Sequence, residues 1–413
     1  MRVLAGKAAE KRVQELSARA SRLDAVEPEV RRILADVHRN RDRALVKYAR
    51  KWDNLQPGQT LLVTPAEMRA AWKAASPGLR SALERAAANI RRFCEWQKPV
   101  EWTRKNDGIL LGQLVRPLDS VGCYVPGGRY PLPSTLLMTV IPAQVAGVGE
   151  IRVVSPKPRS ETLAAAALLG VTEVYRIGGA HAIAALAYGT ETVPRVDKIV
   201  GPGNLYVTTA KKLVAFDCAI DFLAGPTEVV IVAESGQAEF IAADLVAQAE
   251  HDPEALAIFI TSMRTLAERV VACVDEAAKT NAIARQALAA NGVALVATSH
   301  AQALEWANLL AAEHITVARG DLAAVRSAGS VFVGDYSPQA VGDYASGPNH
   351  VLPTAGAARY RGGLSVLDFL KLITMQELSP ASLRRIAPIV TRLAEAEGLE
   401  AHAESVRLRC AHA

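Results

Sequence analysis

Short β-branched runs alternate with helical stretches through the middle of the chain, and this alternation restricts the possible folds more than any other feature. A repeated strand–helix pattern predicts βα units, whose strands form a parallel sheet joined by right-handed crossovers. The first series contains three such units. Its expected strands are 151–156, 173–179 and 198–204, and its expected helices are 161–170, 180–188 and 205–214.

A second series of the same kind begins at residue 228. Its expected strands are 228–233, 255–261, 293–297, 314–318 and 330–334, with helices at 238–250 and 301–312. Outside the two series, 26–49 and 65–96 show apolar residues at helical spacing, and about the last forty residues look helical and polar, without strands. The sequence therefore predicts an α/β protein with two parallel-sheet domains and small helical terminal segments.

The size and composition of the chain fit a globular protein with two domains. It has 413 residues, of which 50% are hydrophobic, and a single core rarely serves so many. We expect no nucleic-acid binding, because no Lys/Arg block is interleaved with aromatic residues, which make up only 5% of the chain. The net charge of +5 is a weak bias toward an anionic cofactor or substrate. We expect no signal peptide, because the N-terminus is charged and lacks an apolar core region. We also expect no membrane span, because the longest apolar stretch, 136–148, is too short to cross a bilayer. The five scattered cysteines, without a CxxC pair, predict reduced thiols in a cytoplasmic protein.

Three glycine-rich segments suggest a nucleotide site in the first series. They are Gly122–Thr135, Gly178–Gly179 and Gly201–Asn204. Glycine lets the backbone approach a ligand closely, and the helix N-terminus that follows favours an anion. Ligands of open α/β sheets bind at the carboxyl ends of the strands, where the second and third segments lie. A structural loop between domains explains the first segment equally well, and no GxGxxG fingerprint is present.

Four polar segments place histidine near a carboxylate or an amide. They carry Gln248 and His251, Glu313 and His314, Asp343 and His350, and Glu397 and His402. Side chains of these types bind zinc when ligands from separate elements converge. Taken singly, the first segment is explained by a solvated helix end, the second by an exposed carboxylate beside a packed histidine, and the last by a solvated surface. The third is a polar loop of the kind that often carries function. The residues alone therefore predict an α/β enzyme that uses a nucleotide, with metal dependence left as an alternative.

Longer motifs, in their order and spacing, resemble the histidinol dehydrogenase family from about residue 25 to the C-terminus. The matching stretches are YVPGGRYPLPSTLLM, GGAHAIAALAYGTETVPRVDKIVGPGN, DFLAGPTEVVIVA, DLVAQAEHDP, the pair Glu313–His314, GDYASGPNHVLPT and EGLEAHAESVRLR. The resemblance implies two incomplete Rossmann-like domains in a domain-exchanged homodimer. The implied parts are a helical segment 1–20, a first domain of 21–122 plus 234–365 with the zinc and substrate residues, an NAD-binding domain 123–233, and an exchanged helical tail 366–413.

The resemblance also implies roles for single residues. The implied zinc ligands are Gln248, His251, Asp343 and, from the partner's tail, His402, and the implied proton-transfer residues are Glu313 and His314. Substrate contacts are implied for the zinc ligands and for Thr227, His314, His350 and Glu397. NAD contacts are implied for Tyr124, His181 and Asn204.

The implied activity is the NAD-dependent oxidation of L-histidinol to L-histidine through bound histidinaldehyde, with one zinc ion per subunit, in the last steps of histidine biosynthesis. Three positions depart from the family pattern: His181 replaces Gln, Thr227 replaces Ser and Ala312 replaces Pro. The first two bear on the binding of the cofactor and of the substrate. Two alternatives stay open: a dehydrogenase of another small polar alcohol, such as a sulfonated diol, and a non-catalytic protein that binds a metal or a nucleotide.

Overall fold

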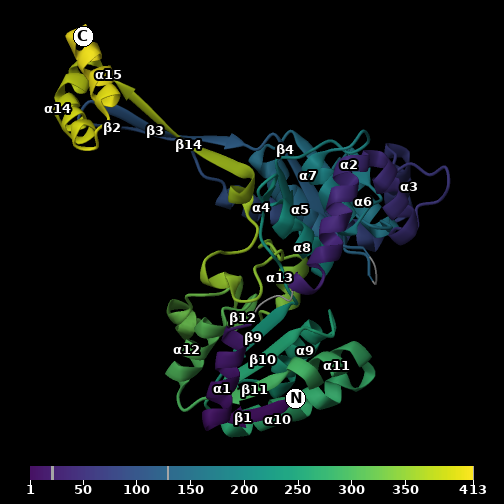
Figure 1. Ribbon diagram of the computed structural model, residues 1–413. Coiled ribbons are helices and arrows are strands. Elements are labelled where there is room, and N and C mark those ends of the chain that lie inside the picture. Colours follow the sequence, from purple (N-terminus) through teal and green to yellow (C-terminus); the bar gives the residue numbers. More distant parts are fainter. Residues whose placement is uncertain (20–22, 128–129, 413) are drawn as a thin grey trace.

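The protein, described here by a computed structural model, has two halves that are each built on one parallel sheet (Figure 1). The structure describes residues 1–19, 23–127 and 130–412. Gly128 and Arg129 of the first glycine-rich segment lie outside the described residues. The two parallel sheets confirm the α/β class predicted from the alternating pattern.

The lower half in Figure 1 contains a six-stranded sheet in the order β1–β11–β10–β9–β12–β13. Its strands are β1 (Arg2–Ala5), β9 (Glu228–Val232), β10 (Leu256–Thr261), β11 (Val293–Val296), β12 (His314–Val317) and β13 (Ser330–Val333). One face is covered by α9 (Ala238–Ala249), α10 (Arg264–Ala277) and α11 (Ala282–Asn291), and the other by α1 (Gly6–Ser17) and α12 (His300–Leu310). Burial on both faces explains why the central strands are continuously apolar.

The upper half contains a five-stranded parallel sheet in the order β6–β5–β4–β7–β8. Its strands are β4 (Ser120–Tyr124), β5 (Glu150–Val154), β6 (Glu173–Tyr175), β7 (Lys198–Val200) and β8 (Ala219–Ile220). The helices on one face are α3 (Pro65–Ala74), α4 (Pro77–Gln97), α5 (Pro133–Ala146) and α6 (Ser160–Leu168). The helices on the other are α2 (Glu27–Trp52), α7 (Gly179–Tyr188) and α8 (Leu205–Val214).

The packing of the N-terminal third differs from the division that the resemblance implied. Helices α2, α3 and α4 cover the five-stranded sheet, because their apolar faces join its two cores. The implied division had grouped them with residues 234–365. Strand β1 lies in the segment 1–20, which was expected to be helical, and it pairs with β11 of the six-stranded sheet. Strand β9 lies in the implied NAD-binding domain 123–233, but it pairs with β10 and β12 and therefore also belongs to the six-stranded sheet.

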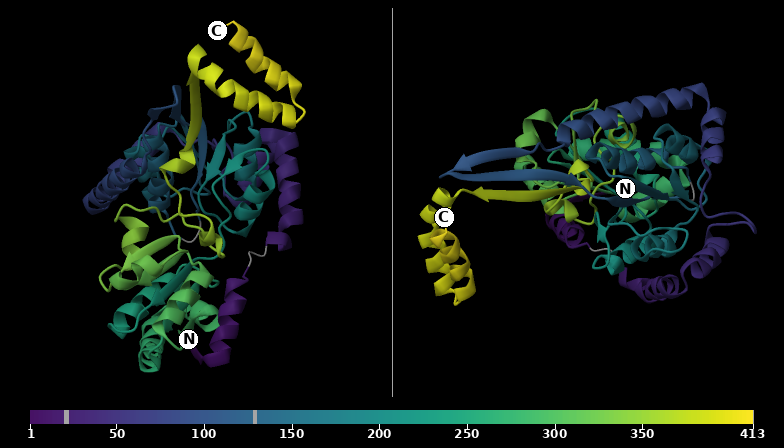
Figure 2. Two further views of the ribbon diagram at one scale, coloured as in Figure 1. Left: turned by 90° about the vertical axis from the view of Figure 1, so that its left-hand side faces the viewer. Right: turned by 90° about the horizontal axis from the view of Figure 1, so that it is seen from above.

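The tail expected to be helical throughout contains a long strand. β14 (Leu370–Leu378) pairs antiparallel with β3 (Ile109–Pro117) along its whole length, and β3 also pairs with β2 (Trp102–Asn106). The strand was missed because most of its side chains are exposed, so no apolar face marks it in the sequence. These three strands form an arm that projects away from both halves, as all three views of Figures 1 and 2 show.

Two helices stand at the end of the arm. They are α14 (Pro380–Ala396) and α15 (Glu400–Ala411), and they pack against each other (Figure 2). Among the described residues, no helix combines the length and apolar character needed to cross a membrane.

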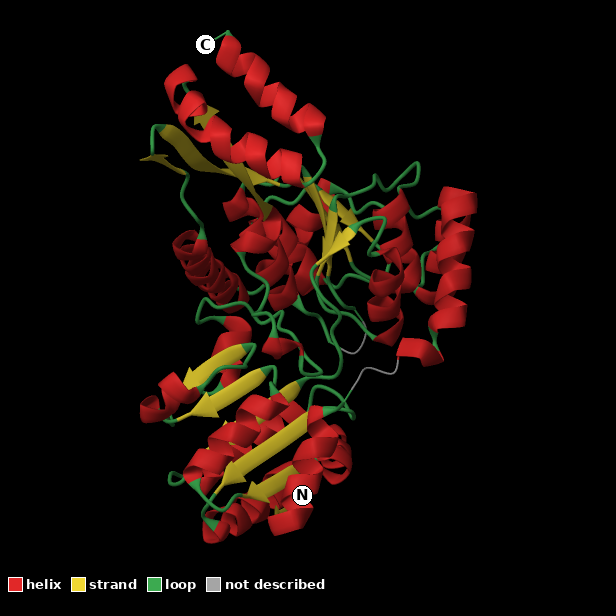
Figure 3. Ribbon diagram, turned by 60° about the vertical axis from the view of Figure 1, so that its left-hand side comes forward, coloured by secondary structure: helices red, strands yellow, loops and turns green. Residues whose placement is uncertain are grey.

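The relative orientation of the two sheets determines which strand ends lie at the candidate site. In Figure 3 the arrowheads of the six-stranded sheet point away from the other half, so the amino ends of its strands face that half. A hydrogen-bond contact between Thr135, in the first turn of α5, and His350, in the loop after α13 (Gln339–Tyr344), joins the halves here. The space between the halves is therefore bordered by the starts of β9 and β12.

Candidate active site

The candidate active site lies where two neighbouring strands of the six-stranded sheet begin. β9 starts at Glu228 and β12 at His314, and the strands pair in parallel with His314 opposite Val229. Glu313 directly precedes β12, so the alternation of side chains along a strand does not force it to the opposite face from His314. Glu313 Oε2 and His314 Nδ1 are 3.8 Å apart. The structure therefore brings the two predicted proton-transfer residues together.

Glu313 is a buried carboxylate that two donors hold in place. The Thr227 hydroxyl donates to its Oε2 over 2.5 Å, and the backbone N–H of Glu228 donates to the same oxygen over 2.9 Å. The Gln248 side-chain amide in turn donates to the Thr227 hydroxyl. Burial raises the pKa of Glu313 above its ordinary value, and the nearby donors and His314 only partly oppose this. A carboxylate in this state is a stronger base than an exposed one.

His314 is held with one ring nitrogen facing a carbonyl group and the other facing a carboxylate. Its Nδ1 lies 3.3 Å from the backbone oxygen of Glu228, and its Nε2 lies 3.6 Å from Asp343 Oδ1. Because a carbonyl oxygen only accepts, Nδ1 carries the proton and Nε2 is the nitrogen that can take one. Burial lowers the pKa of His314, but the carboxylates of Glu313 and Asp343 outweigh burial and raise it overall.

Three of the four predicted zinc ligands lie around this pair. Gln248 and His251 come from the C-terminal end of α9, and Asp343 comes from α13. Burial would raise the pKa of Asp343, but His314, together with His350 and His251, lowers it. His251 Nδ1 lies 3.0 Å from the Ala247 carbonyl oxygen, which leaves Nε2 as the lone-pair donor.

The predicted tail residues are not part of this cluster within one chain. Glu397 follows α14 and His402 lies in α15, at the far end of the arm (Figure 1). Within the described ranges of a single chain, no three His, Cys, Asp or Glu side chains are close enough to hold a metal ion. Because the tail lies far from this cluster within one chain, a fourth zinc ligand from the tail would have to come from a second chain.

His350, predicted to line the substrate pocket, connects the two halves of the protein. Its Nδ1 donates to the backbone oxygen of Asp343 over 2.7 Å, and its Nε2 lies 3.2 Å from the Thr135 hydroxyl. Burial lowers the pKa of His350, which favours the neutral imidazole. His350 thus fixes the end of α13, which carries Asp343, against α5.

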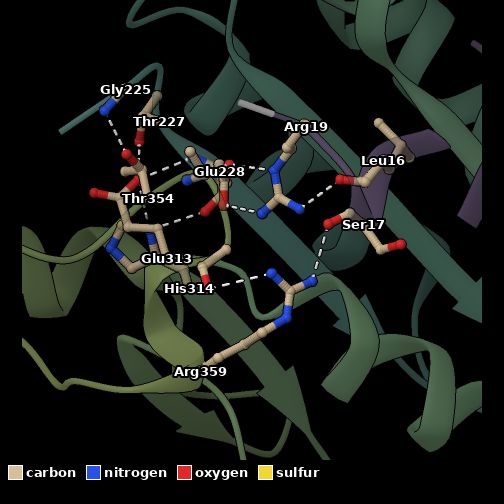
Figure 4. A network of polar contacts seen from close by, with 12 residues as sticks. Leu16, Ser17, Arg19, Gly225, Thr227, Glu228, Glu313, His314, Thr354 and Arg359 are labelled. Carbon is tan, nitrogen blue, oxygen red and sulfur yellow. Dashed lines mark hydrogen bonds and ion pairs between the residues drawn. The ribbon is translucent and has the colours of Figure 1, made fainter. Parts of the chain in front are cut away.

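A buried ion pair behind the site was not found from the sequence. Figure 4 shows Arg19 against Glu228, whose carboxylate oxygens accept from Arg19 Nε and Nη2 at 2.6 Å each. The backbone of the same Glu228 donates to Glu313 and accepts from His314. Arg19 is therefore placed to hold the backbone that positions both predicted proton-transfer side chains. A carboxylate at the first position of a buried strand was the available signal.

The predicted NAD residues cluster at the carboxyl ends of the five-stranded sheet. Tyr124 ends β4, and its hydroxyl accepts from the backbone N–H of Gly179 over 3.1 Å. Asn204 caps α8, where its Oδ1 accepts from the Val207 N–H over 3.2 Å. At Gly201, which has a φ of +111°, a Cβ would stand only 2.2 Å from the Tyr124 carbonyl oxygen. Close packing of one loop on another therefore accounts for this glycine.

His181, at the position where the family has Gln, is buried beneath the Gly178–Gly179 turn. Its Nε2 lies 2.7 Å from Asp53 Oδ2, and the same oxygen accepts from the backbone N–H of Gly178 over 3.0 Å. Its Nδ1 is buried and has no hydrogen-bond partner within the described part of the chain. Asp53, which follows α2, thus ties that helix to the start of α7, a link that the sequence did not suggest.

Comparisons with known proteins agree with the motifs. The family model for histidinol dehydrogenase matches residues 16–410. A histidinol dehydrogenase of Haloarcula marismortui is 50% identical over 401 residues, which cover 94% of each chain, and one of Methanocaldococcus jannaschii is 47% identical over 92% of each chain. The crystal structure of histidinol dehydrogenase from Elizabethkingia anophelis superimposes with a TM-score of 0.93 at 35% identity, covering 99% of this chain and 98% of that one.

The matches extend over nearly the whole chain and both sheets. They therefore include the starts of β9 and β12, where Glu313 and His314 lie, and the arm and tail as well. The chain belongs to the histidinol dehydrogenase family of oxidoreductases.

Proposed function

We propose that the protein oxidises L-histidinol to L-histidine with NAD, through bound histidinaldehyde, in histidine biosynthesis. The observation that supports this most is the pairing of Glu313 and His314, two buried proton-accepting groups 3.8 Å apart in a chain of this family. Oxidation of an alcohol to an acid needs one base for the alcohol and one for the water that enters. The pair supplies both.

The donor set fits one zinc ion held between two chains. The residues that would hold it are Gln248, His251 and Asp343, with His402 supplied by the tail of a second chain. Amide, imidazole and carboxylate groups from separate elements are typical ligands of a catalytic zinc site. The His251 ring is already oriented by the Ala247 carbonyl group, as metal-bound imidazoles commonly are. When bound, zinc supplies a Lewis acid that orients the nitrogen groups of the substrate.

The chain's own residues handle the protons. His314 takes the hydroxyl proton at Nε2 as hydride leaves the substrate carbon, which gives the aldehyde. Glu313 then takes a proton from water as the water oxygen adds to the aldehyde carbon, which gives the hydrate as its monoanion. Loss of a second hydride from this anion to NAD yields the acid. The raised pKa of Glu313 suits it to the water step, because the ionised carboxylate is then a better proton acceptor.

The cofactor would bind at the carboxyl ends of the five-stranded sheet, near Tyr124, His181 and Asn204. Helices α7 and α8 both begin there, and helix N-termini favour the phosphate groups of a dinucleotide. The Nδ1 of His181, which is buried and has no partner among the described residues, supports a polar group at this place. When bound, NAD supplies the hydride acceptor for both oxidations.

Exchange of the tail between two chains would complete each site with Glu397 and His402. In one chain the arm and tail expose large apolar side chains, such as Ile389 at 61% and Leu393 at 58%. Apolar surface of this kind marks a protein interface. We therefore infer a homodimer in which the tail of each chain closes the site of the other.

A metal-depletion assay tests the proposal. NADH formation from L-histidinol and NAD is followed before chelation, after removal of zinc, and after zinc is added back. We expect activity to disappear and then return, while circular dichroism shows an unchanged fold, because the ligands come from elements that pack without the metal. Full activity of metal-free protein would refute the zinc assignment. Faster oxidation of a sulfonated diol than of histidinol would refute the substrate.

A further inference from the structure

A cavity of about 520 Å³ lies at the edge of the six-stranded sheet opposite to the candidate active site. Its floor is formed where β9, β12 and β13 end, whereas Glu313 and His314 stand where β12 begins. One wall is the face of α9 that carries Phe240 and Asp244. None of the residues assigned to zinc, substrate, NAD or proton transfer line this cavity. A ligand bound here would therefore be additional to those of the proposed function.

The sheet topology makes this edge a place for a ligand. β9 lies between β10 and β12, and after β9 the chain crosses through α9 to β10. After β12 the chain turns the other way, to β13. Chain connections thus leave β9 and β12 in opposite directions, and open α/β sheets bind ligands in the crevice at such a switch point.

The charges that line the cavity are mainly negative. Its carboxylates are those of Glu234, Asp244, Asp321 and Asp335, and its basic groups are Arg319 and His300. His300 bridges two of the carboxylates, with Nε2 at 2.7 Å from Asp321 and Nδ1 at 3.2 Å from Glu234. The carboxylates of Asp244 and Asp335 then remain, and Arg319 is the one other basic residue in the lining.

Asp244 is the carboxylate that most needs a cation. It is half-buried on α9 and has no hydrogen-bond or ion-pair partner in the residues that the structure describes. Burial alone raises its pKa to about 6. A partly desolvated carboxylate is stabilised when an opposite charge binds beside it.

Two aromatic rings form the rim of the cavity. Phe240 and Tyr336 are both exposed, and their ring centroids are 6.3 Å apart in an edge-to-face arrangement. Exposed aromatic rings beside carboxylates are suited to an organic cation, which gains from cation–π contact and from burial of its apolar part. The negative phosphates of a nucleotide would instead lie against the carboxylates of Asp244 and Asp335. Repulsion between these like charges makes the cavity unsuited to a dinucleotide.

We propose that this cavity binds a small organic ammonium compound with a flat apolar group, its charge between Asp244 and Asp335 and its apolar part against Phe240 and Tyr336. The aromatic pair and the carboxylates lie where β9 and β12 end, whereas Glu313 and His314 lie where β12 begins. Binding of the cation in this cavity therefore requires neither zinc nor NAD. The site is distinct from the substrate site by position and by residue content.

Calorimetric titration of the full-length zinc-loaded protein with phenethylammonium chloride tests the proposal. We expect saturable binding of this cation and none of phenethyl alcohol or phenylacetate, which have the same ring. Asp244→Asn is expected to weaken binding about 10- to 100-fold, the usual effect of losing a contact to a charged group. Asp335→Asn, an exposed position, gives a second variant if Asp244→Asn does not fold.

Matched controls separate this cavity from other sites. Glu239→Gln makes the same charge change on an exposed position of α9 outside the cavity, and His251→Ala alters the candidate zinc site. Neither is expected to change the affinity for phenethylammonium. Equal binding of the neutral alcohol, unchanged affinity in both aspartate variants, or loss of binding in His251→Ala would each overturn the proposal.

Discussion

Glu313 and His314 are neighbours in the sequence but occupy different environments. Glu313 accepts from the Thr227 hydroxyl and from a backbone N–H, whereas His314 places Nδ1 on a carbonyl group and leaves Nε2 toward Asp343. Different surroundings give neighbouring titratable groups different roles. The geometry therefore fits the proposed division between a base for water and a base for the alcohol.

The first prediction concerns this division. Glu313→Gln should impair the oxidation of histidinaldehyde more than that of histidinol, and His314→Ala should impair the alcohol step most. Losses of about 10²- to 10⁴-fold are expected, because that is the usual contribution of a general base. NADH formation is measured with each substrate supplied separately. Glu305→Gln, exposed on α12, serves as the control. Equal losses in both half-reactions for both variants would contradict the division.

The second prediction concerns the ion pair behind the site. Arg19→Met leaves the Glu228 carboxylate, which is only 3% exposed, without its cation. Breaking a buried pair in this way costs about 3–5 kcal/mol of unfolding free energy, and adding Glu228→Gln should recover part of that loss. Urea unfolding measures the unfolding free energy of the single and the double variant.

The exposed pair of Arg31 with Glu27 provides the control for this experiment. Arg31→Met should cost about 0–1 kcal/mol. A double variant no more stable than Arg19→Met alone would show that the lost stability does not come from an unpaired Glu228.

Glu313 and His314 could be predicted from the sequence as a candidate pair, but the contacts that hold them could not. Glu313 and His314 stand next to each other in the chain, so the motif alone indicated a pair. Arg19 and Glu228 meet only because α1 packs beside β9 on the six-stranded sheet. Local patterns contain no information on such a contact between distant residues.

At the scale of elements, strands buried on both faces were the easiest to predict. β9 and β10 are continuously buried, and their apolar runs stand out in the sequence. All five residues of β2 are exposed, and β14 is mostly exposed, so neither shows an apolar face. Helical spacing in 26–49 and 65–96 predicted apolar faces correctly, but it does not say which sheet a helix covers.

The third prediction concerns the link between α2 and α7. Asp53→Ala leaves the buried Gly178 N–H and His181 Nε2 without an acceptor. Each such loss costs about 1–3 kcal/mol, and movement of the turn should raise the KM for NAD more than it lowers kcat. Steady-state kinetics and urea unfolding measure the two effects. Asp24→Ala, with a side chain 96% exposed, is the control. An unchanged KM for NAD in a destabilised variant would contradict a role in cofactor binding.

In the whole molecule, the arm and tail extend away from both sheets of their own chain, and this placement supports the proposed exchange with a second chain. α14 and α15 pack on each other at the end of the arm, and α15, which carries His402, lies far from α9, which ends just before His251 (Figure 1). The sequence showed a polar helical tail, and only the family resemblance implied that it belongs to another subunit's site.

The fourth prediction tests the exchange by mixing inactive chains. A dimer of one His402→Ala chain and one Gln248→Ala chain should regain activity, because one of its two sites then has every ligand. A dimer of His402→Ala and Glu397→Ala chains should stay inactive, because each of its sites lacks one tail residue. NADH formation is measured after unfolding and joint refolding. Failure of the first pair to recover, in dimers shown to be mixed, would contradict the exchanged tail.

The number of NADH molecules formed per histidinol tests the proposed reaction. A limiting amount of L-histidinol is incubated with excess NAD and zinc-loaded protein until the absorbance of NADH stops rising, and the products are then quantified. We expect two NADH and one L-histidine for each histidinol consumed, with no aldehyde released. One NADH per histidinol with histidinaldehyde as the product, or no NADH at all, would contradict it.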